Sequence, residues 1–319
     1  MILADFLHYF SAIIALCLGA IGGGIGQGIA GFSVIQSLER QPTGNDSEFR
    51  AMVIGLALIE SGIIIALVIT LLLLFGEKKD ISMGIALSEL GIGLAIGLAA
   101  ASISIASSFI VKASCQSIAR QPFFAQKIIT VMLLAQSIIE APVIFAFIIA
   151  LLIKTNITPT MDIIDGVKYL AAGLTIGIGS IGPSIGQAIF GYAACSSIGI
   201  NKNAYNKIFP FTLLSEVVIE TPMIFCLLLA FIIIYTPSSV PQEVLQGATF
   251  LSAAFAIGVS ALGTSIGIGY TAAKSCYQIA YEPSNYPLII RTALLIEAFI
   301  ESAVIYAMIV AFLLIMKVS

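Results

Sequence analysis

The chain has 319 residues, of which 59% are hydrophobic and only 10% are charged, and its formal net charge is −3. Its mean hydropathy is +1.10, and a soluble domain of this length needs far more charge on its surface. Composition therefore excludes a soluble globular protein and predicts an all-α integral membrane protein. A β-barrel is disfavoured, because the apolar runs are too long and lack apolar–polar alternation.

Eight long apolar stretches follow one another in pairs, with a short polar turn inside each pair. They run at about residues 8–40, 47–76, 83–120, 123–153, 163–199, 203–235, 243–281 and 285–316. A helix rises about 1.5 Å per residue, so about 20 residues already span the hydrocarbon. We therefore expect eight transmembrane helices in four tandem hairpins, with repeat boundaries at 1–78, 79–157, 158–238 and 239–319. The first stretch has no basic segment before it, which favours an embedded helix over a cleaved signal peptide.

The first stretch contains the glycine-rich run "GAIGGGIGQGIAG". It is not a phosphate-binding loop, because no lysine followed by serine or threonine completes that motif. In membranes, small residues let helix backbones approach closely. The equivalent positions stay small in the other repeats, at Ser102, Ser104, Ala106, Ser108, Gly182, Ser184, Gly186, Ala188, Gly263, Ser265, Gly267 and Gly269. We therefore expect the first helices of the hairpins to pack tightly in an inner circle.

A glutamate lies in the middle of each second stretch. Glu60 in "LALIESGIII" is followed by three more at separations of 80, 80 and 81 residues, namely Glu140, Glu220 and Glu301. A charged carboxylate at mid-membrane costs about 2.5–3.5 kcal/mol, so the group tends to be protonated or to bind a cation. Four such groups predict an ion carrier. The alternative is a set of carboxylates that only tie helices together by hydrogen bonds.

Polar residues accompany these glutamates and supply oxygen atoms, which a hard cation such as sodium requires. Repeat by repeat, the auxiliary candidates are Gln27 and Ser61, then Ser107, then Gln187 and Thr221, then Ser302 with Ile268 in place of a glutamine. A proline lacks an N–H and frees the carbonyl four residues earlier, so Pro142 frees Ile138 and Pro222 frees Val218.

One turn before each glutamate lies a further set of equivalent residues, namely Leu56, Gln136, Glu216 and Glu297. At a spacing of four residues they face the main glutamates on one side of a helix. We expect the three polar ones to act as hydrogen-bond partners that lock an occupied site, and a simple polar helix contact is the alternative. His8 and Glu89 are read as interfacial residues.

The positive charges favour one orientation. Nine lysines and arginines lie in the hairpin turns or adjoining helix ends, and five lie in the linkers and the C-terminus. The excess predicts cytoplasmic turns. The five cysteines form no CxxC pair and are expected to pack in the helices. The sequence shows no nucleotide motif, metal-ligand cluster or Ser–His–Asp set, so we expect no catalytic group of its own.

These features together resemble a known family. A glycine-rich first helix, the turns "LERQP" and "IARQP" and a mid-membrane glutamate on the second helix are similar to the ring-forming c subunit of rotary F-type ATP synthases. The resemblance covers nearly the whole chain, as four fused hairpins. It implies a non-catalytic subunit that couples ion flow to ATP synthesis or hydrolysis and needs no cofactor, with Na⁺ or H⁺ as cargo.

The resemblance also implies partners and a location. Copies of the chain would form a ring with the first helices inside, turning in lipid against a stator a subunit that carries an essential arginine. Central-stalk subunits would attach to the turns, at Arg40, Gln41, Pro42, Arg120, Gln121 and Pro122. The membrane would be a prokaryotic inner membrane, and no nucleic acid is expected.

The ion follows from the same resemblance. Gln27, Glu60 and Ser61 look like the ligand set of sodium-binding c subunits, in which neighbouring hairpins complete one site. Sodium is therefore favoured slightly over protons. Two other functions remain open, namely a self-contained channel or transporter of eight helices and a purely structural proteolipid. Transporters commonly use inverted repeats, whereas four complete hairpins run in the same direction, which favours the ring.

Overall fold

The computed structural model describes residues 2–41, 44–76, 81–238 and 243–318, and within these residues it contains helices and no β-strand. Pro42, one of the predicted stalk-contacting residues, lies outside this part of the chain. The helices in chain order are α1 (Ile2–Arg40), α2 (Asn45–Leu74), α3 (Met83–Arg120), η2 (Pro122–Phe124), α4 (Ala125–Ile139), α5 (Ala141–Asn156), α6 (Ile163–Ile200), η3 (Lys202–Ala204), α7 (Tyr205–Tyr235), α8 (Glu243–Tyr281), η4 (Pro283–Asn285) and α9 (Tyr286–Val318).

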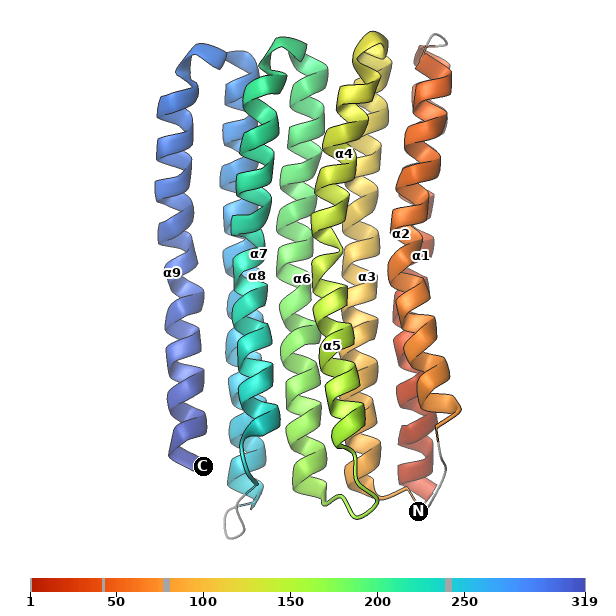
Figure 1. The fold of residues 1–319 in the computed structure, drawn as a ribbon, viewed down its shortest axis with the longest axis vertical. Helices are drawn as coiled ribbons and strands as arrows, with labels where there is room; N and C mark the ends of the chain where they lie inside the picture. The colour runs from red at the N-terminus through yellow and green to blue at the C-terminus, as the bar shows by residue number, and fades with distance from the viewer. Residues whose placement is uncertain (1, 42–43, 77–80, 239–242, 319) are drawn as a thin grey trace.

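The described residues contain eight helical spans that are long and apolar enough to cross a membrane. Four hairpins follow one another along the molecule, with the turns at one end and both termini at the other (Figure 1). The predicted all-α fold of eight transmembrane helices in four hairpins is confirmed.

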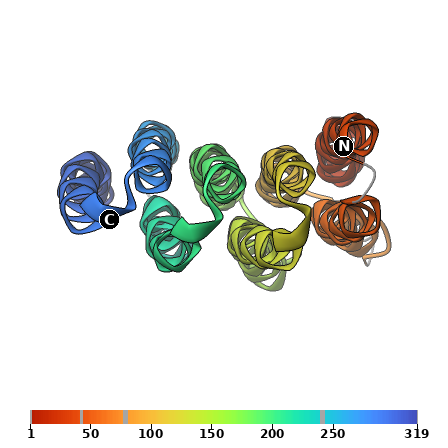
Figure 2. The same ribbon diagram turned by 90° about the horizontal axis from the view of Figure 1, so that it is seen from above.

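The hairpins stand side by side in two rows (Figure 2). One row contains the first helices, α1, α3, α6 and α8, each in extensive contact with the next. The other contains the second helices, α2, α4 with α5, α7 and α9. The rows bend gently, and the first helices lie on the inside of the bend (Figure 2).

Small residues allow the row of first helices to pack at backbone distance. A Cβ atom on Gly91 would lie 2.6 Å from the carbonyl oxygen of Tyr169 on the neighbouring helix, and one on Gly182 would lie 2.6 Å from the Cα of Leu262. Neither position accommodates a side chain without a shift of the backbone. The small residues thus allow the backbones of neighbouring first helices to pack in direct contact.

The second spans of the first three hairpins each lie in the groove between two first helices. α2 contacts α1 and α3, and α7 contacts α6 and α8. The last second helix, α9, packs on α8 and α7. The two ends of the rows therefore expose surfaces that are covered everywhere else.

The second span of repeat two departs from the continuous helix predicted at 123–153. It is interrupted at Glu140, between α4 and α5, and Pro142 occupies the first turn of α5. Pro142 has no N–H to donate to the preceding turn, which explains the interruption. Proline alone does not dictate it, since α7 continues through both Pro210 and Pro222.

Polar contacts join neighbouring hairpins at both ends of the molecule. On the turn side, Asn201 Nδ2 donates to the carbonyl oxygen of Ala280 at 2.8 Å. On the opposite side, Glu89 binds His8 Nδ1 at 2.5 Å and Lys154 Nζ at 3.1 Å. His8 and Glu89 are both buried. Both residues were predicted to lie at the membrane interface, and their pairing was not predicted.

The residues of the predicted stalk-contacting turns lie at the turn end. Arg40 and Arg120 are the last residues of α1 and α3. The backbone N–H of Gln121 donates to the carbonyl oxygen of Ser117 at 2.9 Å, and Pro122 opens η2.

Candidate ion-binding sites

The four glutamates lie near the middle of the second helices, but they differ in exposure. Glu60 is exposed, Glu140 and Glu301 are half-buried, and Glu220 is buried. Each lies in a predominantly apolar membrane-spanning segment, where the surrounding medium offers a carboxylate little solvation. The environment of each therefore depends on which polar neighbours reach it.

Glu140 receives its neighbour from the preceding hairpin. The Ser61 hydroxyl on α2 lies 2.6 Å from Glu140 Oε2 and 2.7 Å from the carbonyl oxygen of Leu58. Ser61 is adjacent to Glu60 in sequence, and the two residues were predicted to belong to one ligand set. The structure instead brings Ser61 to the glutamate of the next repeat.

Glu220 receives its neighbour from its own hairpin. Gln187 Nε2 on α6 donates to Glu220 Oε2 at 2.7 Å. The other oxygen of Glu220 and the side-chain oxygen of Gln187 are buried and accept no hydrogen bond. This pairing is the one that the sequence expected within repeat three.

The residues one turn earlier do not hydrogen-bond to the main glutamates. Gln136 Nε2 donates to Ser107 Oγ at 2.8 Å and to the carbonyl oxygen of Gly55 at 3.4 Å. Ser107 thus pairs with Gln136 rather than with Glu140. Glu216 and Glu297 are fully buried, and neither oxygen of either side chain has a hydrogen-bond partner.

For the remaining auxiliary residues, the described part of the chain shows no hydrogen bond to a main glutamate. Thr221 donates to the carbonyl oxygen of Val217 at 3.3 Å, and Ser302 donates to that of Phe299 at 2.7 Å. Gln27 is half-buried on α1.

Two serines on the first helices complete the surroundings and were not singled out as ligands from the sequence. Ser104 donates to the carbonyl oxygen of Ile59 at 3.0 Å, and Ser265 donates to that of Ile219 at 3.1 Å. Both acceptors directly precede a main glutamate. The signal was present in the repeat register, because the two serines occupy equivalent positions, but they were counted only as small residues.

No group of three or more His, Cys, Asp or Glu side chains that could hold a metal ion occurs among the residues that the structure describes. A cation at these glutamates would therefore depend on amide, hydroxyl and backbone oxygens. Near Glu220, one amide oxygen and three carboxylate oxygens lack hydrogen-bond partners, namely Gln187 Oε1, Glu220 Oε1 and both oxygens of Glu216.

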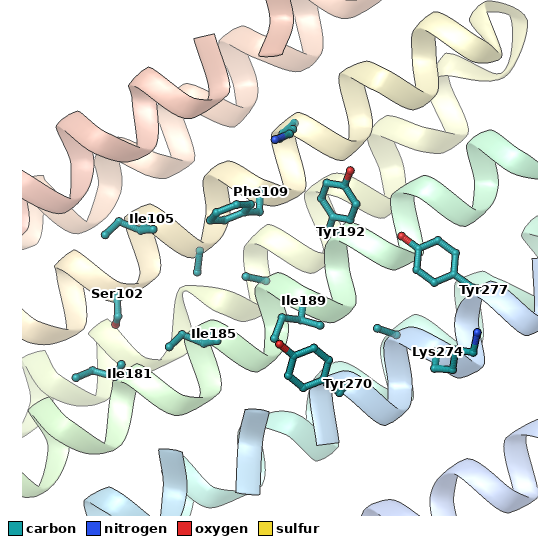
Figure 3. Close-up of a pocket in the computed structure, with 14 residues that line it drawn as sticks. Ser102, Ile105, Phe109, Ile181, Ile185, Ile189, Tyr192, Tyr270, Lys274 and Tyr277 are labelled. Atoms are coloured by element: carbon teal, nitrogen blue, oxygen red, sulfur yellow. The ribbon is translucent and has the colours of Figure 1, made fainter. Parts of the chain in front are cut away.

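One groove lies away from the glutamates. It encloses about 810 Å³, and all its lining residues come from the first helices α3, α6 and α8 (Figure 3). The lining is almost entirely apolar, with three tyrosines and the two lysines Lys112 and Lys274. Because no second helix contributes to it, this groove belongs to the inside of the bend and not to the ion sites.

Comparison with known proteins finds the same unit four times. The family of ATP synthase c subunits matches residues 10–73, 90–153, 170–233 and 251–314. The chain is 43% identical over 76 residues to the ATP synthase c subunit 2 of Pelobacter propionicus, covering 24% of this chain and 84% of the relative. It is 44% identical over 71 residues to the ATP synthase c subunit of Dehalococcoides mccartyi, covering 22% of this chain and 93% of the relative. It is 43% identical over 77 residues to the corresponding protein of Geotalea daltonii, covering 24% and 85%.

Proposed function

The chain belongs to the family of ATP synthase c subunits, and from this membership we propose that it is a rotor component that carries Na⁺ or H⁺ on Glu60, Glu140, Glu220 and Glu301. The observation that carries the proposal is that each of the four matched segments contains one of these glutamates. The protein performs no chemistry on ATP itself. It couples ion passage to ATP synthesis or hydrolysis in other subunits.

A mid-membrane carboxyl must be neutral while it faces lipid, and the surroundings of Glu140 support such a state. The Ser61 hydroxyl has one proton but two oxygen neighbours, Glu140 Oε2 and the carbonyl oxygen of Leu58. When Glu140 is protonated, its O–H donates to Ser61, and Ser61 donates to Leu58. When Glu140 is ionised, Ser61 turns its proton to the carboxylate.

Sodium is the preferred cargo, and protons are the alternative. The support comes from repeat three, where four buried oxygens of Glu216, Glu220 and Gln187 lack hydrogen-bond partners. An unpaired buried carboxylate is costly, and a cation among these oxygens would remove that cost. A proton on each carboxyl removes much of this cost too, so the labelling experiment below distinguishes sodium from protons.

The partners follow from the proposed rotor. Copies of the chain form the ring, whose second helices pass a stator a subunit with an essential arginine. Central-stalk subunits bind the turns, which face the cytoplasm. Lipid fills the groove on the inside of the bend, where the exposed apolar lining of α3, α6 and α8 has no protein cover. Since the relatives are bacterial, the membrane is a bacterial plasma membrane.

The proposal is tested by labelling the purified assembly with dicyclohexylcarbodiimide, which modifies protonated carboxyls in apolar surroundings. Mass spectrometry then measures the modification of each glutamate with and without sodium chloride. Modification of the four glutamates that sodium suppresses supports a sodium rotor, and modification that ignores sodium supports a proton rotor. If none of the four reacts, or if the chain transports ions as an isolated monomer, the rotor proposal is wrong.

A further inference from the structure

A second pocket, of about 250 Å³, lies between the first and second hairpins at the end of the molecule opposite the hairpin turns. Its lining includes the buried side chains of His8 on α1 and Glu89 on α3, together with Lys154 near the end of α5. Thr158 and Pro159 are exposed and mark its opening. The pocket is far larger than the share of one water molecule in the liquid, which is about 30 Å³.

One ring nitrogen of His8 lacks a partner in this pocket. Glu89 accepts a hydrogen bond from Lys154 Nζ at 3.1 Å, and its other oxygen lies 2.5 Å from His8 Nδ1. Because a carboxylate paired with an ammonium group is ionised, His8 Nδ1 is the donor in the second contact. His8 Nε2 is buried and has no hydrogen-bond partner among the residues that the structure describes. Nearly all buried polar atoms in proteins have one, so this nitrogen points to a missing ligand.

The three ionisable residues of the pocket are not part of the repeat. At the equivalent positions of the other repeats lie Ser88, Lys168 and Thr249 for His8, Tyr9, Tyr169 and Phe250 for Glu89, and Leu74, Ile234 and Ile315 for Lys154. The other interfaces between hairpins form without this combination. Neither the packing of hairpins nor the transport function that the repeats share therefore requires it, which indicates a role particular to this pocket.

The charges of the pocket favour an anion. Those of Glu89 and Lys154 cancel, so the net charge depends on His8. Imidazolium donates through both ring nitrogens, and an ammonium group has three N–H donors, of which Glu89 uses one. An imidazolium at His8 thus presents Nε2–H to the pocket beside the remaining donors of Lys154, and a single anionic charge neutralises the whole cluster.

A phosphate group matches these donors. Its several oxygens are strong acceptors that form short, charge-assisted hydrogen bonds with cationic N–H groups. The donors come from α1 and α5, and Thr158 adds a hydroxyl at the opening. The rest of the lining is largely apolar and lies near the ends of the membrane-spanning helices, at Leu73, Ile81, Ile85 and Ile157.

We propose that this pocket binds a singly charged phosphate group through His8 Nε2 and Lys154 Nζ, while Glu89 holds both donors in place. The phosphate belongs either to the headgroup of an anionic phospholipid, whose apolar part the lining accommodates, or to free inorganic phosphate. The site is separate from the four mid-membrane glutamates and does not depend on the proposed ion transport.

His8 is the only histidine of the chain, so its ring nitrogens give one set of NMR signals. The full-length assembly, labelled with ¹⁵N-histidine, is titrated with inorganic phosphate in detergent at constant pH and ionic strength. In a second arm it is placed in nanodiscs of phosphatidylcholine with increasing phosphatidylglycerol. We expect a saturable change of the Nε2 signal. A response to inorganic phosphate identifies the free anion as a ligand, and a response to phosphatidylglycerol alone identifies the lipid headgroup.

Substitutions then assign the donors. Lys154→Gln is expected to raise the half-saturating concentration about tenfold, as the loss of a charged hydrogen bond implies, and Lys154→Arg should stay within about threefold of the wild type because it keeps the charge. Because Lys154 also binds Glu89, Thr158→Val at the exposed opening is a second variant that leaves this pair intact, with an expected weakening of about threefold. Lys317→Gln, which alters an exposed lysine at the same end of α9, is the control.

Native mass spectrometry verifies that the variants keep the copy number of the wild type. An Nε2 signal that responds in neither arm shows that the pocket holds only water and overturns the proposal. Equal weakening by Lys317→Gln and Lys154→Gln also overturns it, because the response then reflects surface charge alone. Both results leave the rotor function untouched.

Discussion

Buried oxygen atoms without partners gather around Glu220. Glu216 and Gln187 contribute to this group, and in native proteins nearly all buried polar groups are hydrogen-bonded. The exception is explained if these oxygens receive a cation or protons as part of a loading cycle. At the residue scale, these oxygens therefore have a function in ion loading, although without a cation or protons they would weaken the fold.

Gln187→Leu tests the amide in this group. Losing its hydrogen bond to Glu220 (2.7 Å) is expected to raise the sodium concentration that halves carbodiimide labelling of Glu220 about fivefold, with no change at Glu60. Gln126→Leu, at an exposed position near the turn, serves as the control. Equal effects of the two substitutions at Glu220 would contradict the assigned role.

Ser107→Ala tests the hydrogen bond between Gln136 and Ser107, which lies one helical turn from Glu140. The substitution leaves the buried amide of Gln136 without its 2.8 Å partner, and an unsatisfied buried group costs about 1–3 kcal/mol. The free energy of unfolding, measured by titration with denaturing detergent, is expected to fall by that amount. Ser137→Ala, which alters an exposed serine, is expected to change it by less than about 0.5 kcal/mol. A Ser107→Ala chain as stable as this control would rule out the supporting contact.

The sequence predicted the main glutamates because they recur in register within apolar runs. It predicted that Gln187 lies near Glu220 because both side chains supply oxygens that a sodium ion requires and because the family resemblance implies such a set. It could not assign the Ser61 hydroxyl to Glu140, because helical spacing fixes which residues share a face but not which neighbouring helix that face meets. For the same reason, Gln136 was expected beside Glu140 and instead pairs with Ser107.

At the scale of the element, the interrupted second helix of repeat two is the clearest departure from the repeat. The break between α4 and α5 lies at Glu140, and Pro142 follows it directly. Proline signals in the sequence indicated a freed carbonyl in both repeat two and repeat three. The helix is interrupted next to Pro142 in repeat two, whereas α7 continues through Pro222 in repeat three.

Pro142→Ala is expected to close this break, because alanine restores the missing N–H donor. Hydrogen exchange at the amides of residues 142–144 is expected to be slow, as in an uninterrupted helix. Pro222→Ala in α7 is the matched control, and exchange at residues 223 and 224 should change little because α7 is already continuous. Rapid exchange at 142–144 in the Pro142→Ala chain would show that proline does not cause the break.

At the scale of the whole molecule, the four hairpins form two bent rows. The first helices repeat one packing contact along the row, and this leaves matching faces of α1 and α8 uncovered at its two ends. The first helices lie inside the bend (Figure 2), as expected from their small residues. The eight spans and their pairing into hairpins were predictable from apolar length and the repeat. The uncovered surfaces of α1 and α8 at the two ends of the row were not predictable, because the repeat pattern does not show which first helices lack a neighbour within the chain. The division into repeats at residues 78, 157 and 238 stays a prediction.

Gly263→Leu is expected to prevent copies from associating while leaving each chain folded. A Cβ atom on Gly263 meets nothing within 4 Å in the chain, whereas on the equivalent Gly22 it would lie 2.6 Å from the carbonyl oxygen of Ala101. The leucine would thus clash only with a neighbouring copy. Native mass spectrometry should detect single chains with the helical content of the wild type. Ala57→Leu, on an exposed position of α2, should assemble normally, and assembly of both variants would refute contact between copies at Gly263.

The central claim is that the four glutamates carry the ion that couples to ATP. The most direct measurement is ATP-driven uptake of radioactive sodium, alongside acidification, by liposomes that contain the whole complex with this chain. The account predicts sodium or proton uptake by the wild type, and none when Glu60, Glu140, Glu220 and Glu301 are all replaced by glutamine in a complex that still assembles. Uptake that persists without the four carboxylates would contradict it.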